Sequence, residues 1–314
     1  MQQGVLHKVF TSDGLDGNAH LLMDLVEYAF NMMEQPPDVA EPMGQYVTRR
    51  LENYAKAKHP ELEHDTSFME SFLRWMNLVV GTHESCAHWD DVSTQTQYEE
   101  LEAMTPCKHA SLFSPPLPEK KVKAIDNLSI GVVDKIVLLF EEIWWPTDVI
   151  CFAFLWRAQD LATVPEEDKW TTMVFGASIS MANEKCLVFW TSGDEAKLVE
   201  TLSDDVVKSK LMGLLRKFMA KNHVIPEPID MVSNPYSRGS YSFDNVYTPD
   251  HPEVRADLAE PIYDQKGKLR LMFAGEATSK SHFSTVHGAI ESGRREAHRF
   301  LKTDFNFVPT EAEE

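Results

Sequence analysis

Cysteine is scarce in this chain, and its four residues are widely separated: they are Cys86, Cys107, Cys151 and Cys186. No C-x-x-C pair occurs, which excludes a zinc ribbon and a thioredoxin-like redox motif. Four cysteines in 314 residues are also too few for a disulfide framework, so a reducing compartment is expected.

Long hydrophobic runs are missing too. The longest, residues 149–156, is far short of the ~20 apolar residues that span a bilayer, and no membrane segment is predicted.

Glycine motifs that hold phosphate groups are also missing. The fourteen glycines include no G-x-G pair, which excludes both the dinucleotide fingerprint and the P-loop. A G-x-S-x-G nucleophile elbow does not occur either. His83, His88, Asp90 and Asp91 lie near one another, but their spacing fixes no metal geometry. We therefore expect an ordinary polar loop there, and no metal site is predicted.

Positive charge is in the minority, with 30 lysines and arginines against 49 acidic residues and a net charge of −19. Such a chain repels phosphates, which argues against nucleic acid or an anionic membrane as a partner. The same field favours a small cationic ligand. The N-terminus shows no signal peptide, and the final Glu-Ala-Glu-Glu is not a peroxisomal address, so we expect a cytoplasmic protein.

Hydrophobic periodicity divides the chain into a helical front and a mixed back. Helices are predicted at 21–33, 46–54, 68–80 and 206–219, and near the C-terminus from about Thr285 to Leu301. Strands are predicted at 130–140, 149–157, 172–175, 186–190 and 269–274, with short ones around Met231 and Tyr241. The β-branched and aromatic content of these stretches favours strands. The predicted fold class is therefore α+β.

The segment from Leu271 to Ala297 carries the most specific local pattern. It predicts a buried strand, an acidic residue at its end, a loop and a helix. Gly288 and Gly293 lie on that helix, where glycine costs about 1 kcal/mol relative to alanine, so another backbone or a flat ligand is expected to approach closely. The first helical turn offers free N–H groups and the positive dipole end to an anionic ligand atom. A tightly packed terminal helix is the alternative.

This segment resembles the C-terminal signature of the flavin amine oxidases, which include polyamine, spermine and monoamine oxidases and the flavin-dependent histone demethylases. The matching motifs are Phe273-Ala-Gly-Glu276, Ser284-Thr-Val-His-Gly-Ala289 and Ser292-Gly-Arg-Arg-Glu-Ala297. Residues 89–93, 113–118, 131–135, 141–146 and 234–242 also match, in family order. The resemblance covers most of residues 1–302 and is strongest to the spermine and acetylpolyamine oxidases.

The resemblance implies a role for five residues. Lys135 would hold a water against flavin N5, and Glu276 would lie by the ribityl–pyrophosphate part of FAD. Thr285 and Val286 would face the N1–C2=O edge of the ring, where a helix dipole stabilises the charge of reduced flavin. Tyr241 would form an aromatic wall for a cationic amine. A strand lysine is costly to bury unless it is paired or reaches solvent, so an exposed lysine is the alternative for Lys135.

The resemblance thus implies an FAD cofactor, a small cationic polyamine substrate, and oxidative cleavage that produces hydrogen peroxide. The predicted organisation is a helical part of the substrate domain at 1–104, a strand-rich part at 105–245, and a remnant of an FAD-binding domain at 246–314. The main hypothesis is that the sequence is an incomplete chain of a polyamine oxidase, and two alternatives remain open. One is a non-catalytic paralog that acts as a binding module. The other is a histone demethylase relative, which is disfavoured because no long charged hairpin interrupts the helical region.

The chain also departs from the family pattern. The strand, G-x-G-x-x-G turn and helix that bind the FAD pyrophosphate are not found. Only residues 105–111 span an interval where the family carries strands on the adenine side, and Met231 stands where a tryptophan is usual. We therefore expect the ring edge of a flavin site without its nucleotide half, weak FAD binding, and an uncovered apolar face that fits a protein partner.

Overall fold

The computed structural model describes residues 6–33, 35, 37, 41–83, 86, 88–92, 94, 113–234, 241–244 and 254–305. Of the segments singled out in the sequence, residues 105–111 and 235–240 lie outside the described part. The contacts divide the chain into two compact units. The sheet unit comprises Met1–Gln35, Pro42–Asp91 and Gly131–Ser240, and the C-terminal unit comprises Pro36–Glu41, Val92–Ile130 and Tyr241–Glu314. Most of the two predicted substrate-domain parts, 1–104 and 105–245, falls within the sheet unit, whereas Val92–Ile130 groups with the C-terminal unit.

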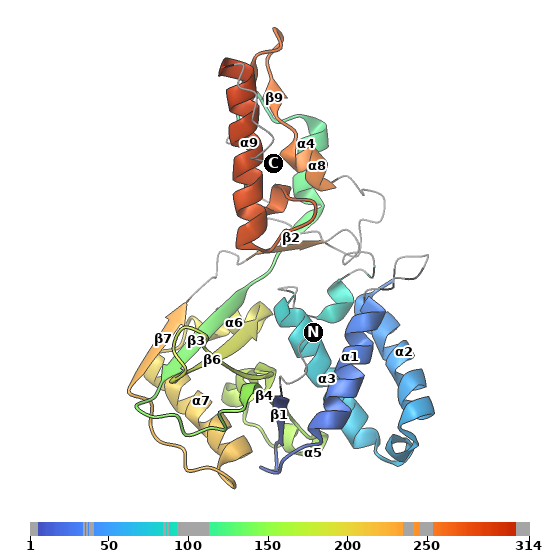
Figure 1. The fold of residues 1–314 in the computed structure, drawn as a ribbon, viewed down its shortest axis with the longest axis vertical. Helices are drawn as coiled ribbons and strands as arrows, with labels where there is room; N and C mark the ends of the chain where they lie inside the picture. The colour runs from blue at the N-terminus through green and yellow to red at the C-terminus, as the bar shows by residue number, and fades with distance from the viewer. Residues whose placement is uncertain are drawn as a thin grey trace. The chain divides into compact units, whose positions relative to one another are not determined.

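A six-stranded mixed sheet with the order β1-β4-β5-β6-β3-β7 forms the centre of the sheet unit (Figure 1). Its strands are β1 (Leu6–Thr11), β3 (Val133–Leu139), β4 (Val149–Leu155), β5 (Gly176–Ile179), β6 (Cys186–Ser192) and β7 (Asp230–Asn234). The β1–β4 pair is parallel, and the other pairs are antiparallel. The predicted strands within 130–140, 149–157 and 186–190 are confirmed.

Two expectations for this unit are wrong. The first hundred residues were expected to be helical, but β1 precedes the helices and pairs with β4. A strand was expected at 172–175, but a 3₁₀ helix, η4 (Glu166–Met173), extends into that stretch, and β5 begins only at Gly176. The hydroxyls of Thr171 and Thr172 donate to carbonyls three residues back, at 2.7 Å each. These hydrogen bonds make the tight turn more stable than an extended backbone at this position.

The two faces of the sheet differ in burial. Ile136, Leu138, Leu187 and Phe189 are fully buried, in one core with residues of α7 (Asp204–Met219). Side chains alternate between faces along a strand, so the intervening residues form the opposite surface, which we call the open face. It consists of Lys135, Val137, Val188, Trp190 and Val232, which are cross-strand neighbours. Each is partly or fully exposed, and Val232 is 59% exposed. The expected uncovered apolar surface is present here.

Four helices of the sheet unit confirm predicted ones, and two short helices were not predicted. They are α1 (Ala19–Met33), α2 (Met43–Lys58), α3 (Thr66–His83), α5 (Ala158–Leu161), α6 (Gly193–Val199) and α7. The short 3₁₀ segments η1 (Pro60–His64) and η2 (Trp89–Asp91) lie around α3. Helix α1 packs on β1 and α2 (Figure 1), and its apolar stripe of Leu22, Leu25 and Ala29 is fully buried. Within the described residues, no helix combines the length and hydropathy needed to cross a membrane.

The C-terminal unit contains short strands and one long helix. Its elements are α4 (Glu119–Asp126), β2 (Leu128–Ile130), β8 (Ser242–Asp244), α8 (Val254–Ala259), β9 (Ile262–Tyr263), β10 (Leu269–Leu271), η5 (Glu276–Thr278) and α9 (Val286–Phe305). β2 pairs antiparallel with β8, and β9 with β10. The strand predicted at 269–274 shrinks to three partly exposed residues, whereas the predicted closing helix is confirmed as α9. Helices and a mixed sheet together confirm the predicted α+β class.

The two glycines of α9 have different surroundings. A Cβ at Gly288 would lie 1.9 Å from the carbonyl oxygen of His282, whereas one at Gly293 would have no described atom within 4 Å. A closely approaching backbone is therefore confirmed at Gly288, whereas at Gly293 no described backbone approaches and the expectation of a flat ligand stays a prediction.

Gly288→Ala should lower the free energy of unfolding by roughly 1–3 kcal/mol, because the loop at His282 must move. Gly293→Ala is the matched control and should raise it by about 1 kcal/mol through helix propensity. Urea unfolding of the two variants measures both effects. Equal changes of the same sign would contradict the described packing.

Candidate functional site

Glu276 is at the centre of the candidate site in the C-terminal unit. It begins η5, directly after Gly275, whose φ of 136° suits glycine. The Ser242 hydroxyl lies 3.2 Å from both carboxylate oxygens of Glu276, and the backbone N–H of Ser284 also donates to this carboxylate. Burial raises the pKa of Glu276 to about 7. Near neutral pH this carboxyl group therefore exchanges between an acceptor and a donor of hydrogen bonds.

The N-terminus of α9 is capped by Thr285. Its hydroxyl accepts a hydrogen bond from the Gly288 amide at 2.9 Å and donates to the His282 carbonyl at 2.5 Å. A threonine at this position is a favourable N-cap. Val286, the first helical residue, is 78% exposed. The first turn of a helix has amide N–H groups without intrahelical acceptors and carries the positive dipole end. This turn can therefore receive an anionic atom from solvent.

Four of the five predicted residues belong to the C-terminal unit. Glu276 is joined to the start of α9 through the Ser284 amide and to β8 through Ser242. Tyr241, which is partly exposed, directly precedes Ser242. The structure thus brings Glu276, the Tyr241–Ser242 segment and the Thr285–Val286 turn to one place. Lys135 belongs to the sheet unit, and its convergence with the other four stays a prediction.

Lys135 lies on the open face of the sheet. It is exposed, as in the alternative interpretation of a strand lysine, and its ammonium lies 4.4 Å from the centroid of the Trp190 ring. Trp190 is the cross-strand neighbour of Lys135, and a lysine over an indole face is a favourable cation–π pair. Lys135 therefore presents a positioned ammonium on a surface that also carries Val137, Val188 and Val232.

Sequence reasoning did not identify three residues that support these positions. They are Ser242 against Glu276, Trp190 against Lys135, and Arg295. The Arg295 guanidinium donates to the carbonyls of Phe273 and Thr278, at 3.0 and 2.8 Å, and pairs with Glu296. It thereby holds both ends of the turn that carries Glu276. Arg295 lies within the matched C-terminal motif, and that was the only available indication.

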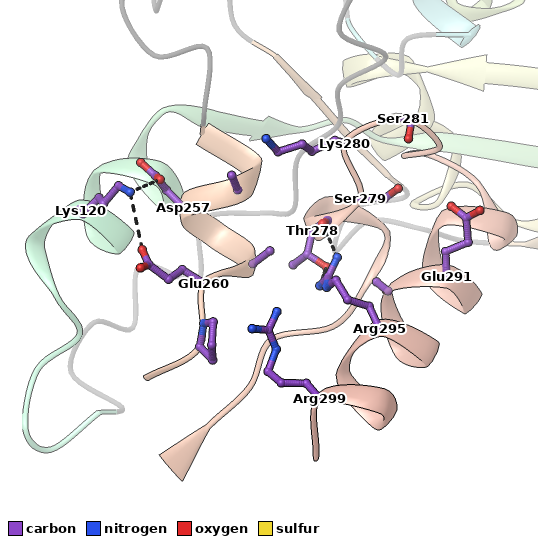
Figure 2. Close-up of a pocket in the computed structure, with 14 residues that line it drawn as sticks. Lys120, Asp257, Glu260, Thr278, Ser279, Lys280, Ser281, Glu291, Arg295 and Arg299 are labelled. Carbon is purple, nitrogen blue, oxygen red and sulfur yellow. Dashed lines mark hydrogen bonds and ion pairs between the residues drawn. The ribbon is translucent and has the colours of Figure 1, made fainter. Parts of the chain in front are cut away.

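A cavity of about 680 Å³ lies within the C-terminal unit, between α4, α8, η5 and α9. Figure 2 shows Lys120, Asp257 and Glu260 on one side and Thr278, Arg295 and Arg299 on the other. Lys120 pairs with Asp257 at 2.5 Å, and Arg299 pairs with Glu296 at 2.9 Å. Charged side chains of both signs therefore line this cavity.

Residues 88–91, the part of the expected polar loop that follows the undescribed positions, make one contact within the turn and one to α2. The Asp91 carboxylate accepts from the His88 amide at 3.0 Å, and the Asp90 carboxylate accepts from the Gln45 amide at 3.0 Å. Carboxylates used in this way shape the backbone, in agreement with the polar loop that the sequence predicts there.

Glu276→Gln tests the partly buried carboxyl group through stability. Because the pKa rises from the usual 4.5 to about 7 on folding, the stabilising contribution of this group is complete below pH 4.5. It is lost as the pH increases through 7. The free energy of unfolding of the variant should therefore rise relative to that of the parent chain between pH 4.5 and 7. Above pH 7 the difference should be roughly 1–3 kcal/mol. Unfolding at several pH values gives this difference. The exposed Glu184→Gln is the control, and a difference that does not vary with pH would contradict the account.

Comparison with known proteins identifies the family. Residues 103–301 match the model for "Flavin containing amine oxidoreductase". Peroxisomal N(1)-acetyl-spermine/spermidine oxidase of Bos taurus is 37% identical over 205 residues, which cover 61% of this chain and 39% of that protein. Possible lysine-specific histone demethylase 1 of Drosophila melanogaster is 33% identical over 198 residues, with 60% and 21% covered. Cyclohexylamine oxidase from Brevibacterium oxydans IH-35A has a TM-score of 0.46 at 16% identity, with 64% and 42% covered.

The family model covers more than half of the chain, so the chain belongs to the flavin-containing amine oxidoreductases. The resemblance inferred from the C-terminal motifs is thereby confirmed. The chain spans about two fifths of the length of the bovine relative.

Proposed function

We propose that this chain carries the amine-binding side and the ring-edge contacts of an FAD-dependent polyamine oxidase. The observation that carries the proposal is the placement of Glu276. Its partly buried carboxyl group lies against Ser242 and the Ser284 amide, at the start of the capped helix α9. Both elements belong to the stretch that matches the flavin family.

The residues present fit the ring and ribityl parts of FAD. Glu276 would accept hydrogen bonds from ribityl hydroxyls, which would replace the water lost on burial and keep the carboxylate ionised. The first turn of α9, at Thr285 and Val286, would offer amide donors and the positive dipole end to the N1–C2=O edge. When bound, the flavin supplies the two-electron acceptor for amine oxidation.

Two further residues would act on the amine side. Tyr241 would pack its ring against the cationic amine, and the Lys135 ammonium would orient a water molecule beside the reacting carbon. A net charge of −19 supports a cationic substrate because it raises the local concentration of polyamines. The name of the bovine relative, an N(1)-acetyl-spermine/spermidine oxidase, further supports this substrate class.

The proposed reaction removes a hydride from the carbon beside a secondary amine nitrogen. Water then hydrolyses the resulting imine to an aldehyde and a shorter amine, and dioxygen takes up the two electrons and two protons as hydrogen peroxide. The cytoplasmic location expected from the sequence is part of this proposal.

A second candidate is a non-catalytic binding module. It is favoured by the open face, where Val137, Val188 and Val232 present apolar surface around Lys135 and Trp190. Surfaces of this kind commonly bind other proteins.

Anaerobic mixing of the chain with excess FAD and a polyamine separates the two candidates. The proposal predicts loss of the oxidised flavin absorbance with spermine, spermidine or N1-acetylspermine. A peptide containing dimethyl-lysine, tested in parallel, addresses the histone demethylase alternative. If neither substrate reduces flavin that is demonstrably bound, the binding module is the better account.

A further inference from the structure

Three potential metal ligands meet where the loop after η5 enters α9. They are His282 from the loop, and His287 and Glu291 from the first turns of the helix. The Glu291 carboxylate contacts both imidazoles: its oxygens are 2.8 Å from Nδ1 of His282 and 3.0 Å from Nε2 of His287. The two rings are stacked, with centroids 4.3 Å apart and an interplanar angle of 25°. The three ligand atoms all lie within 4.8 Å of one another.

The fold holds these side chains in place from two elements. His287 and Glu291 are four residues apart on α9, so they project from the same side of the helix. The backbone of His282 is fixed by two bonds: its amide donates to the Ser279 hydroxyl at 3.2 Å, and its carbonyl accepts from Thr285 at 2.5 Å. The same carbonyl approaches the helix at Gly288, where a Cβ would lie only 1.9 Å away. The small residue thus lets the loop bring His282 to its partners.

We propose that His282, His287 and Glu291 bind one divalent transition-metal ion of the zinc class. Imidazole nitrogen and carboxylate oxygen suit such ions, with bonds of about 2.0–2.2 Å. Bonds of that length place ligand atoms roughly 3–3.5 Å apart in a tetrahedral site. The two Glu291 contacts, made by different carboxylate oxygens, are close to that spacing, and all three ligand atoms lie within 4.8 Å of one another. Rotation of the side chains brings the two histidine nitrogens closer together.

The accessibility of the three side chains agrees with a site that an ion enters from solvent. They are between 42% and 62% exposed. Three protein ligands leave one position of a tetrahedral ion for water. Bound metal would tie the loop after η5 to α9, beside the turn of Thr285 and Val286. The sequence predicted no metal because the three ligands span the loop–helix boundary, where spacing alone fixes no geometry.

Calorimetric titration of the chelator-treated full chain with zinc chloride tests the proposal. We expect one saturable site, with His282→Ala, His287→Ala and Glu291→Gln each weakening binding at least about tenfold, as expected for loss of a ligand. His298→Ala, on the same helix, is the matched control and should leave the affinity within about twofold. Circular dichroism confirms that each variant is folded. The proposal is overturned if the parent chain shows no saturable binding, or if His287→Ala binds zinc as well as the His298 variant.

A second titration with cobalt(II) separates this site from the cysteines. The proposal predicts that the parent chain shows a visible cobalt spectrum without a thiolate-to-metal charge-transfer band. This visible spectrum should be lost in His287→Ala. A thiolate band in the parent chain that persists in this variant would assign the ion to cysteine and overturn the proposal.

Discussion

Lys135→Met is expected to slow flavin reduction by polyamine by about 10²-fold or more, within the range attributed to positioned acid–base groups. The ammonium of Lys135 is exposed on the open face and is held over Trp190. Methionine keeps much of the apolar stem but can neither donate a hydrogen bond nor orient a water molecule. Stopped-flow absorbance under anaerobic conditions, with excess FAD, gives the rate of reduction directly.

Lys197→Met is the control for this change. Lys197 is an exposed lysine of α6 that pairs with Asp194, and its loss should leave the rate within about twofold. FAD affinity should be the same in both variants, which separates an effect on the chemistry from one on cofactor binding. An unchanged rate in Lys135→Met would dismiss the role proposed for this residue.

FAD itself is expected to bind this chain weakly. Its affinity should be at least about 10³-fold lower than that of a site with a complete pyrophosphate cradle. The 314 residues contain no G-x-G turn, and such a turn places amide groups and a helix N-terminus against the two phosphate charges. Each charge-assisted hydrogen bond that is missing is worth roughly 1.5–3 kcal/mol. A factor of ten corresponds to ~1.4 kcal/mol, so three or four such bonds account for the loss.

Quenching of flavin fluorescence during titration measures this affinity. Riboflavin is the matched ligand, because it has the ring and the ribityl chain but no phosphate. The account predicts that FAD and riboflavin bind with similar, weak affinity, and that Glu276→Gln weakens both. Stoichiometric FAD binding at sub-micromolar concentration would contradict the account and indicate that other residues hold the nucleotide half.

Elements with a regular local pattern could be predicted from the sequence, including the short strands β7 and β8 near Met231 and Tyr241, whereas β1 and η4 could not. The apolar residues of α1 recur at helical spacing, which predicts a helix. The β-branched residues of β3 favour a strand. β1 has only six residues, and its partner β4 is far away in sequence, so no local pattern reveals the pairing. The 3₁₀ turn at Thr171 and Thr172 depends on side-chain hydrogen bonds to nearby carbonyls, and these competed successfully with a strand.

The candidate site was predictable only where a motif carried it. Glu276 and the Thr285–Val286 turn belong to contiguous family motifs, whereas Ser242 approaches Glu276 from another segment of the chain. Trp190 meets Lys135 only through the β3–β6 register. The division into two discontinuous units is also invisible to local patterns, because it depends on which distant segments pack together.

Product analysis tests the central claim most directly. The full chain is incubated with excess FAD and N1-acetylspermine or spermine in air, and the amines and hydrogen peroxide are quantified. If the chain carries the amine-binding side and ring edge of a polyamine oxidase, a shorter amine and an aldehyde accumulate with one hydrogen peroxide per cleavage, and Lys135→Met abolishes most of this turnover. Intact polyamine in the presence of bound FAD, with no hydrogen peroxide above the control without protein, would contradict the account.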